Sequence, residues 1–399
     1  MMERTKYEWG DGVYTLLSWF QKDKVKNARV LVAGAGALGN EVVKNLALFG
    51  VGHIFVVDFD RIEVSNLTRS VLFREEDAFN HAYKAGVVAR RAMEINPQIK
   101  VTPIVGNLAS EVGQGLYRSV DVVIGCLDSR IARYLLNRHC IRAGKTWVDG
   151  GIENLSGVVR TFVPGESCYE CSLSREEFNH IMLRTGCADV VRRQESAGRV
   201  ATTPISASIV AAIQVQEALK VIHRETLDEN SYSTLQGKML SYEGMNNSMR
   251  IFKFASWKHN CPAHRQWTDV RACPGLSAKL PVREAFALIK KALGVKAVEI
   301  ELVNNKFIDK IVSEKPEKEF VVKLPESKLD DFISANKELR LLSYRTIFHK
   351  SFFEYVDKAF PYPQLTLQEV GIPPYDVLQV ATEKGMFFLE LTDDASLFE

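Results

Sequence analysis

The sequence has little net charge and few cysteines. Its 51 Lys and Arg residues nearly balance its 49 Asp and Glu residues, which leaves a formal net charge of +2 at pH 7. This balance gives no electrostatic indication of a nucleic-acid or membrane partner, and we expect neither. The seven cysteines are an odd number in a chain of 399 residues. In a reducing cytoplasm, which is the location we expect, cysteines serve as metal ligands, nucleophiles or core residues rather than as disulfides.

Long uninterrupted hydrophobic runs are also missing, and we expect no export signal. The most apolar long stretch, 205–222, contains Gln214, Gln216 and Glu217, so we expect a buried helix rather than a membrane span. The first twelve residues have no apolar core of the signal-peptide kind. A hydrophobic content of 46% and a charged content of 25% are typical of a soluble globular protein. The length predicts two or three domains.

A glycine-rich turn between an apolar strand and a helix is the central motif. Residues 30–33 form a short apolar run, typical of a buried parallel strand. Three glycines with G-x-G-x-x-G spacing follow it: Gly34, Gly36 and Gly39. Such glycines permit the tight turn, the approach of a phosphate to the backbone, and close packing of the helix. A second strand ends at Asp58, where a carboxylate can bind ribose hydroxyls. The unit predicts nucleotide binding without identifying the nucleotide.

The segment after Asp58 differs from an ordinary β–α connection. The polar run Ser65-Asn66-Leu67-Thr68-Arg69 can fold back over a triphosphate, with Asn66 donating to phosphate oxygens and Arg69 neutralising the leaving pyrophosphate. Taken singly, a turn asparagine and a solvated arginine are the simpler interpretations. Lys84 lies in the first turn of a helix expected over 81–95, where the helix dipole disfavours a cation. This position suits a phosphate-binding lysine, and a surface lysine is the alternative.

A second acidic strand end follows downstream. The apolar strand expected over 121–128 ends at Asp128. Ligands in open α/β sheets bind at the carboxyl ends of the strands, so Asp58 and Asp128 are expected to face one site. Two carboxylates beside a triphosphate indicate Mg²⁺, which proteins hold through one or two carboxylates together with phosphate oxygens.

Two distant pairs of residues have the spacing of zinc ligands. Cys168-x-x-Cys171 lies on an expected turn, and Cys261-x-x-His264 follows far downstream. Together they predict a tetrahedral Cys₃His structural zinc site that ties two separated parts of the chain. Cys273 and His259 remain alternatives to His264 as the fourth ligand.

The stretch 172–204 is polar, rich in arginine and without clear periodicity, so we expect a mobile loop or small insertion there. Cys187 lies in it, away from both metal pairs. Neighbouring arginines can lower the pKa of this thiol and favour a thiolate nucleophile. A lone cysteine is more often inert, so both interpretations stay open on these residues alone.

The remaining sequence predicts further elements without a catalytic constellation. Residues 13–20 are expected to form a short amphipathic helix, and 276–399 an α+β domain. Within that domain, 297–302 and 307–312 alternate like the strands of one hairpin, and 366–391 reads as a helix, a turn and two strands.

Taken together, the motifs resemble the ubiquitin-activating enzyme superfamily, which includes the bacterial adenylyltransferases of molybdopterin and thiamine biosynthesis. The layout is closest to the catalytic subunits that activate ubiquitin-like proteins. The resemblance covers about residues 25–265. It is carried by the glycine spacing, Asp58-Phe59-Asp60, Ser65-Asn66-Leu67-x-Arg69, Lys84-Ala85, Leu127-Asp128-Ser129-x-x-Ala132-Arg133, Cys168-x-x-Cys171 and Asn260-Cys261-Pro262.

This resemblance implies ATP–Mg²⁺ chemistry on the C-terminal glycine of a ubiquitin-like protein. The glycine carboxylate would attack the α-phosphate, giving an acyl adenylate and pyrophosphate. By the family's pattern, Asp58 would bind ribose and Asp128 the Mg²⁺. Asp60 belongs to the same site, and the phosphates would be bound by Asn66, Arg69 and Lys84. Cys187, in Gly186-Cys187-Ala188, would then take the acyl group as a thioester.

The resemblance also implies a domain layout and partners. Residues 1–275 would form a Rossmann-like α/β adenylation domain with a mostly parallel sheet, a cysteine-bearing loop at about 172–204, and a zinc closure at 256–275. Residues 276–399 would form a smaller α+β domain. Its stretch 367–380 resembles the ubiquitin-fold domain that recruits a conjugating enzyme, which favours conjugation over sulfur transfer.

Three departures from the family pattern affect these expectations. The N-terminal Arg-x-x-Arg-Gln, which reaches a partner's ATP site, is not recognisable, so both a homodimer and a heterodimer remain possible. Ser70 and Ser129 replace a glutamine and an asparagine, and His264 replaces the last zinc cysteine.

Three other functions compete with this interpretation. The first is a sulfur-carrier-protein adenylyltransferase. An NAD(P)-dependent oxidoreductase would leave Asn66, Arg69 and Lys84 unused. A non-catalytic scaffolding subunit would have no need of the phosphate-binding set.

Overall fold

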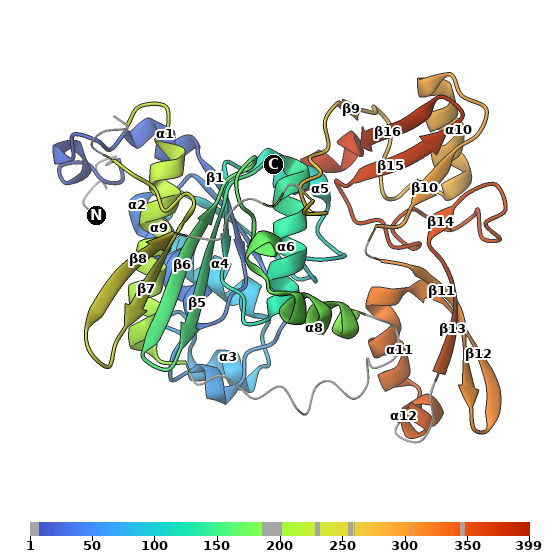
Figure 1. Ribbon diagram of the computed structural model, residues 1–399, viewed down its shortest axis with the longest axis horizontal. Coiled ribbons are helices and arrows are strands. Elements are labelled where there is room, and N and C mark those ends of the chain that lie inside the picture. Colours follow the sequence, from blue (N-terminus) through green and yellow to red (C-terminus); the bar gives the residue numbers. More distant parts are fainter. Residues whose placement is uncertain are drawn as a thin grey trace, which may run out of the picture. The chain divides into compact units, whose positions relative to one another are not determined.

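The computed structural model describes residues 8–185, 202–227, 232–253, 258, 260–303, 305–343 and 348–399. The chain divides into two compact units, and most of their helices and strands are labelled in Figure 1. The first unit comprises residues 1–108, 117–174 and 200–265, and the second comprises 109–116, 175–199 and 266–399.

The first unit is built on an eight-stranded sheet with the order β3-β2-β1-β4-β5-β6-β7-β8. The first five strands in this order pair in parallel, and the last three add antiparallel pairs at one side. The strands are β1 (Arg29–Ala33), β2 (His53–Val57), β3 (Lys100–Ile104), β4 (Val122–Gly125), β5 (Trp147–Glu153), β6 (Ser156–Phe162), β7 (Lys238–Glu243) and β8 (Ser248–Lys253). This confirms a mixed α/β, Rossmann-like fold with a mostly parallel sheet.

Helices connect these strands. They are α1 (Lys22–Asn27), α2 (Ala37–Phe49), α3 (Glu75–Phe79), α4 (Lys84–Ile95), α5 (Gln114–Ser119), α6 (Arg130–Ala143), α7 (Tyr169–Ser172) and α9 (Pro204–Ile222), with short 3₁₀ turns η1 (Tyr14–Leu16) and η2 (Val64–Asn66). Side chains alternate across the sheet. Val30 and Val32 of β1 join the apolar cluster formed with α2, α4 and α9. On the other face, Trp147 and Leu136 of α6 meet beside Gly125.

The strand order shows at which edge of the sheet a ligand is expected to bind. β1 lies between β2 and β4, and all three run parallel. The chain leaves β1 toward β2 and β3 and later returns to the opposite side of β1 as β4. The residues that follow β1, β2 and β4 therefore lie at one edge, at the point where the strand order reverses. Open α/β sheets bind ligands at this position.

α9 is the one helix in the described ranges that is long and apolar enough to span a membrane by length and composition alone, and half of its apolar window is buried. Val210, Val215 and Leu219 belong to the core cluster of the first unit. Glu217 is buried and accepts hydrogen bonds from the Thr161 hydroxyl and the Lys220 ammonium. Packing within the unit accounts for the composition of this helix, as the sequence predicted.

The second unit contains two sheets. A five-stranded sheet has the order β14-β10-β15-β16-β9, with a single parallel pair between β16 and β9, and a three-stranded sheet has the order β12-β11-β13. The strands are β9 (Val270–Ala272), β10 (Glu299–Glu301), β11 (Phe307–Glu314), β12 (Glu317–Pro325), β13 (Phe348–Phe353), β14 (Tyr355–Val356), β15 (Val377–Thr382) and β16 (Gly385–Glu390). The helices are α8 (Arg175–Thr185), α10 (Val282–Leu293), α11 (Leu329–Ala335) and α12 (Lys337–Ser343), with 3₁₀ turns η3 (Glu326–Lys328) and η4 (Thr392–Leu397). Each sheet has its own apolar cluster.

Four local expectations were wrong. Residues 13–20 contain only the 3₁₀ turn η1, because the Tyr14 ring stacks on Phe49 and its hydroxyl donates to the Leu48 carbonyl, which holds this stretch against the end of α2. In the stretch 172–204, for which we expected a mobile loop or small insertion without periodicity, the described part includes the regular helix α8. β10 pairs with β14 and β15, whereas β11 pairs with β12 and β13, so they are not one hairpin. The alternation of apolar and polar residues identified β10 and β11 as strands but did not identify the strands with which they pair.

The fourth error concerns the segment before β15. The expected helix after Thr366 is a series of turns, because Gly371 adopts φ +106° and two prolines follow it. The two strands expected after it are present as β15 and β16.

Candidate nucleotide site and metal centre

The three motif positions favour glycine for different physical reasons. Gly34 follows β1 with φ +101°, and a Cβ there would lie 2.4 Å from the Cys126 carbonyl oxygen. A Cβ on Gly39 would lie 2.0 Å from the Gly34 carbonyl oxygen, because α2 packs closely on the turn. Gly36 differs, since a Cβ there would meet no atom of the described residues within 4 Å. The fold requires Gly34 and Gly39, whereas Gly36 leaves open space in which a phosphate can approach the backbone.

Asp58 holds the glycine turn in place. Its carboxylate accepts hydrogen bonds from the Ala35 N–H (2.7 Å) and the Asp60 N–H (2.8 Å). Burial raises the pKa of Asp58, and these two N–H donors oppose that rise. The residue expected to bind ribose is therefore also a structural anchor that joins the end of β2 to the turn after β1.

Asp60 and Lys84 form a close ion pair. The Lys84 ammonium lies 2.7 Å from the Asp60 carboxylate, and the Lys84 backbone N–H donates to the Asp60 carbonyl at 3.0 Å. Lys84 lies in the first turn of α4, as the sequence predicted, but the helix begins at Lys84 rather than at residue 81, where His81 adopts φ +47°. Arg61 supports this contact from the neighbouring position, since its guanidinium lies 3.9 Å from the centre of the Tyr83 ring and donates to the His81 carbonyl. The acid after β2 thus fixes the lysine at the start of α4.

Asn66 and Arg69 are held by local contacts. The Asn66 side-chain oxygen Oδ1 accepts the Glu63 N–H at 3.0 Å, which leaves the side-chain NH₂ group as the part that can donate to a ligand. Arg69 donates to the Ser65 carbonyl at 2.7 Å. Both side chains are partly exposed. These contacts fit the turn interpretation of this segment, and a phosphate role for either residue stays a prediction.

Asn40, which sequence reasoning missed, joins two parts of the site. It directly follows Gly39, and its side chain is fully buried. Its amide nitrogen donates to the carbonyls of Ala35 (2.8 Å) and Gly36 (2.9 Å), and its amide oxygen accepts the Leu72 N–H (3.0 Å). The available signal in the sequence was a polar residue directly after the third motif glycine.

Asp128 follows β4 at the same edge of the sheet as Asp58, but its side chain is exposed. Its loop is held by Arg133, which donates to the Leu127 and Gly150 carbonyls. An exposed carboxylate at the carboxyl end of a parallel strand is a donor of the type that Mg²⁺ prefers, so the chemistry of the residue fits such an ion.

A buried acid that the motif reading did not single out lies beneath this loop. Asp149 of β5 is fully buried and accepts hydrogen bonds from Arg133 (2.9 Å) and Arg160 (3.0 Å). Burial raises the pKa of Asp149, but the two guanidinium groups together lower this pKa by more than burial raises it, so the net shift is downward. The acid remains ionised and fixes Arg133, which in turn holds the loop that carries Asp128.

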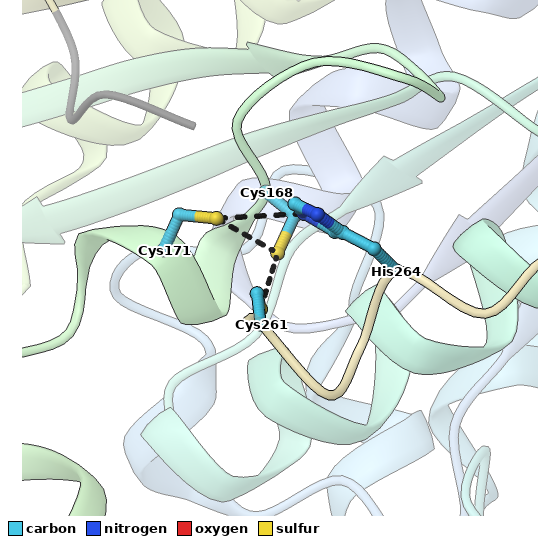
Figure 2. A group of neighbouring side chains, drawn as sticks. All are labelled: Cys168, Cys171, Cys261 and His264. Atoms are coloured by element: carbon cyan, nitrogen blue, oxygen red, sulfur yellow. Dashed lines mark hydrogen bonds between the residues drawn. The ribbon is translucent and has the colours of Figure 1, made fainter. Parts of the chain in front are cut away.

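The two predicted zinc pairs come together in the first unit (Figure 2). Cys168 Sγ lies 3.8 Å from Cys171 Sγ and 3.7 Å from Cys261 Sγ, and Cys171 Sγ lies 3.4 Å from His264 Nε2. A tetrahedral zinc ion with Zn–S bonds of about 2.3 Å and Zn–N bonds of about 2.0 Å places its ligand atoms roughly 3.5–3.8 Å apart. The sulfur separations are far longer than a disulfide bond, so all three cysteines are free thiols.

Neighbouring side chains support this cluster. Cys168 precedes α7 and Cys171 lies within it, while α6 contributes Ile141 to the surrounding apolar contacts. Arg138 of α6 forms a two-pronged ion pair with the buried Glu170, at 2.9 and 3.2 Å. Burial lowers the pKa of His264, which favours the neutral imidazole that a metal requires.

The structure also bears on the alternative fourth ligands. Cys273 lies in the apolar core of the second unit rather than with the other three cysteines. His259 falls outside the described residues. His264 is therefore the ligand that the described part of the chain brings to the cluster.

Cys187 also lies outside the described residues, so its role stays a prediction.

The family of the chain follows from comparison with known proteins. The ThiF family model matches residues 15–263. The chain belongs to the ThiF family. The match covers the whole sheet of the first unit, the glycine turn and all but one residue of the zinc cluster.

The chain is also similar to individual members of this group. It is 32% identical over 235 residues to a sulfur carrier protein adenylyltransferase of Thermus thermophilus, covering 57% of this chain and 79% of that protein. It is 34% identical over 157 residues to a SUMO-activating enzyme subunit of Caenorhabditis elegans, covering 39% of this chain and 27% of that protein. The chain thus matches most of the first relative but only about a quarter of the second.

A crystal structure of MccB from E. coli with ATP is 26% identical, with a TM-score of 0.49, over 61% of this chain and 68% of that chain. Likeness at this level supports no inference about the fold or the ligand of this chain.

Proposed function

We propose that this protein uses ATP to adenylate the C-terminal glycine of a small carrier protein of the ubiquitin-like type. The observation that carries the proposal is the arrangement at the carboxyl edge of the parallel sheet. There the open position at Gly36 lies on a turn held by Asp58, and Lys84 is fixed at the start of α4 by Asp60. Membership of the ThiF family supports the same reaction class, since the Thermus relative is named an adenylyltransferase.

In this reaction the C-terminal carboxylate attacks the α-phosphorus of ATP. A new O–P bond forms, the bond to the β-phosphate breaks, and pyrophosphate leaves with the bonding electrons. The chain's residues act by positioning and by electrostatics. Backbone N–H groups at the start of α2 and the Lys84 ammonium would face phosphate charge. Asp58 would bind ribose, and Asn66 and Arg69 would contact the outer phosphates.

Two metal ions accompany this proposal. Asp128 would hold Mg²⁺, which neutralises phosphate charge. Cys168, Cys171, Cys261 and His264 would hold a structural zinc ion, which ties the turn after β6 to the chain that follows β8. The ligand separations support a closed structural site.

We further propose a thioester step on Cys187. Its thiolate would attack the acyl carbon of the adenylate, the bond to AMP would break, and AMP would leave. The supporting feature is the position of Cys187 in the sequence, 16 residues after Cys171.

The second unit would then recruit a conjugating enzyme. Its own two apolar clusters, each with its own sheet, support a binding domain. The domain limits of 1–275 and 276–399 belong to this proposal. A second subunit, identical or related, would complete the adenylation site.

A specific observation also favours sulfur transfer as the second candidate. The Thermus relative, a sulfur carrier protein adenylyltransferase, matches along 79% of its length, whereas the SUMO-activating subunit matches along 27%. In that case adenylation is retained, and Cys187 forms no transferable thioester.

One experiment separates these outcomes. The full chain is incubated with ATP–Mg²⁺ and soluble lysate of its source, and products are resolved by non-reducing electrophoresis and identified by mass spectrometry. A thiol-sensitive adduct that is lost in Cys187→Ala supports conjugation-type activation. A carrier that stays adenylated or becomes persulfide-linked supports sulfur transfer. The absence of any adduct and of AMP would refute adenylation by this chain alone.

A further inference from the structure

The side chain of Asn40 is the feature that neither the motif nor the proposed reaction accounts for. It is fully buried at the start of α2, beside the glycine turn. Its amide nitrogen donates to the Ala35 and Gly36 carbonyls at 2.8 and 2.9 Å, and the Gly36 carbonyl also accepts the Asn40 backbone N–H at 2.9 Å. These two carbonyls of the turn are therefore satisfied from inside the protein, which leaves them turned toward Asn40 rather than toward a ligand.

The other end of the same amide reaches a different segment. The Asn40 carbonyl oxygen accepts the Leu72 N–H at 3.0 Å. Leu72 follows Arg69 by three residues, and the intervening Ser70 is buried, so this part of the chain is anchored against the first unit. One side chain thus bonds both to the glycine turn and to the backbone just after the predicted phosphate-binding residues Asn66 and Arg69.

We propose that Asn40 is a positioning residue. It fixes the glycine turn and the segment 66–72 relative to each other, so that both contact the same triphosphate. The inference rests on the proposed function, because it assigns a role to this residue within the nucleotide site. A nucleotide with only an α-phosphate needs the glycine turn alone. A triphosphate needs both parts at once, so the link through Asn40 contributes selectively to ATP over AMP.

The protein contains a matched control for this role. Asn96 is also fully buried, its amide nitrogen donates to the Ala47 carbonyl at 2.9 Å, and its amide oxygen accepts the Gln98 N–H at 3.0 Å. Like Asn40, it is a buried asparagine that donates to a backbone carbonyl and accepts a backbone N–H, but its donor bond goes to the end of α2 away from the glycine turn and its acceptor bond is local. A substitution that affects only folding should lower the unfolding temperature by a similar amount at both positions.

The test measures binding of AMP and of ATP with Mg²⁺ by calorimetry to the full-length protein and to three variants, with thermal unfolding as a check of folding. Asn40→Ser removes the reach to Leu72 but keeps one hydroxyl donor, which can bond the Gly36 carbonyl four residues earlier. Asn40→Asp keeps an acceptor for the Leu72 N–H but loses both donors to the turn. Asn96→Ser is the control.

We expect Asn40→Ser to weaken ATP binding about tenfold and AMP binding less than about threefold, as for one lost linking hydrogen bond and its coupled contacts. Asn40→Asp should weaken both nucleotides by similar factors, and Asn96→Ser should change neither. Equal losses for ATP and AMP in Asn40→Ser, or no loss, would overturn the inference. It is also overturned if both Asn40 variants fail to fold while Asn96→Ser folds. A wild-type protein that binds no ATP would instead refute the proposed function itself.

Discussion

The Lys84 ammonium lies 2.7 Å from the Asp60 carboxylate, and it is 13% exposed whereas the carboxylate is 50% exposed. The acid that follows β2 thereby holds the lysine that begins α4. A cation at a helix N-terminus is disfavoured by the helix dipole, and the ion pair offsets this cost. A bound triphosphate would offer the same lysine a stronger partner, because phosphate oxygens carry more negative charge.

Replacing Lys84 by alanine should therefore damage catalysis far more than folding. We expect the rate of ATP–pyrophosphate exchange to fall about 100-fold, as for loss of one charged group at a phosphoryl-transfer centre. The free energy of unfolding should change by less than about 1 kcal/mol, because one partner of the pair is half-exposed.

Lys220→Ala is the matched control for this variant. Lys220 makes an equally short ion pair, 2.7 Å from Glu217, on α9. Its replacement should leave exchange unchanged. If both lysine variants lose activity equally, Lys84 has no special role at the phosphates.

Two glycine substitutions should separate folding from ligand binding. Gly36→Ala adds a methyl group where no described atom lies within 4 Å, so the free energy of unfolding should change by about 0.5 kcal/mol or less. The same methyl group occupies the space in which a phosphate approaches the turn, so ATP binding should weaken by about tenfold or more.

Gly39→Ala should show the opposite pattern. Its Cβ would lie 2.0 Å from the Gly34 carbonyl oxygen, so overpacking should lower the free energy of unfolding by about 1–3 kcal/mol. Denaturant unfolding and nucleotide titration measure the two effects. A Gly36→Ala protein that binds ATP normally would show that the open space at this position serves another purpose.

The cysteine–histidine cluster should bind one zinc ion per chain. Elemental analysis of the purified protein should find zinc in the wild type and lose it in Cys171→Ser and in His264→Ala, with a lower unfolding temperature because metal binding contributes to folding. Cys273→Ser should retain zinc, since Cys273 lies in the apolar core of the second unit. Loss of zinc on replacing Cys273, with retention on replacing His264, would reverse the ligand assignment.

Asp149 should make stability depend on acid pH. Its pKa is shifted below the ordinary value of 3.8, since Arg133 and Arg160 outweigh the effect of burial. A carboxyl group whose pKa is lower in the folded state stabilises the fold fully above its unfolded-state pKa, and this contribution is lost as the pH falls through the folded-state value. Stability measured by urea unfolding should therefore decline below about pH 4 in part through this group.

Asp149→Asn should remove that acid-linked contribution and lower stability at pH 7 by about 3–5 kcal/mol, because two buried guanidinium groups lose their charged partner. Asp121→Asn serves as control, because Asp121 is an exposed carboxylate that accepts the Arg29 N–H at 2.7 Å. An Asp149→Asn protein as stable as wild type at pH 7 would contradict the bridging role of this acid.

Much of the nucleotide site could be predicted because local sequence determines it. The glycine spacing, Asp58 and Lys84 each follow directly from a strand or helix end that the pattern of apolar residues identifies. The zinc cluster could be predicted because its ligands come in two recognisable pairs, although the pattern left His264 and Cys273 as alternatives. Only the packing of Cys273 in a separate core separated them.

Other features depend on tertiary contacts that the sequence does not reveal. Asn40 acquires its role from Leu72, which lies 32 residues away, and Asp149 acquires its role from arginines on α6 and β6. The pairing of β10 with β14 and β15 depends on a long connection that carries the three-stranded sheet between them. Such partners are set by how elements pack, so periodicity alone could not identify them.

The most direct test of the account is exchange of labelled pyrophosphate into ATP by the full-length protein. The reaction contains Mg²⁺ and, one at a time, the ubiquitin-like and sulfur carrier proteins of the source organism that end in glycine. Label should enter ATP only when the correct carrier is present, and none should enter with a carrier that lacks its last glycine. Exchange by Gly36→Ala should be reduced about tenfold or more when ATP is below saturation. Exchange that needs no carrier, or tight NAD binding without exchange under any condition, would contradict the account.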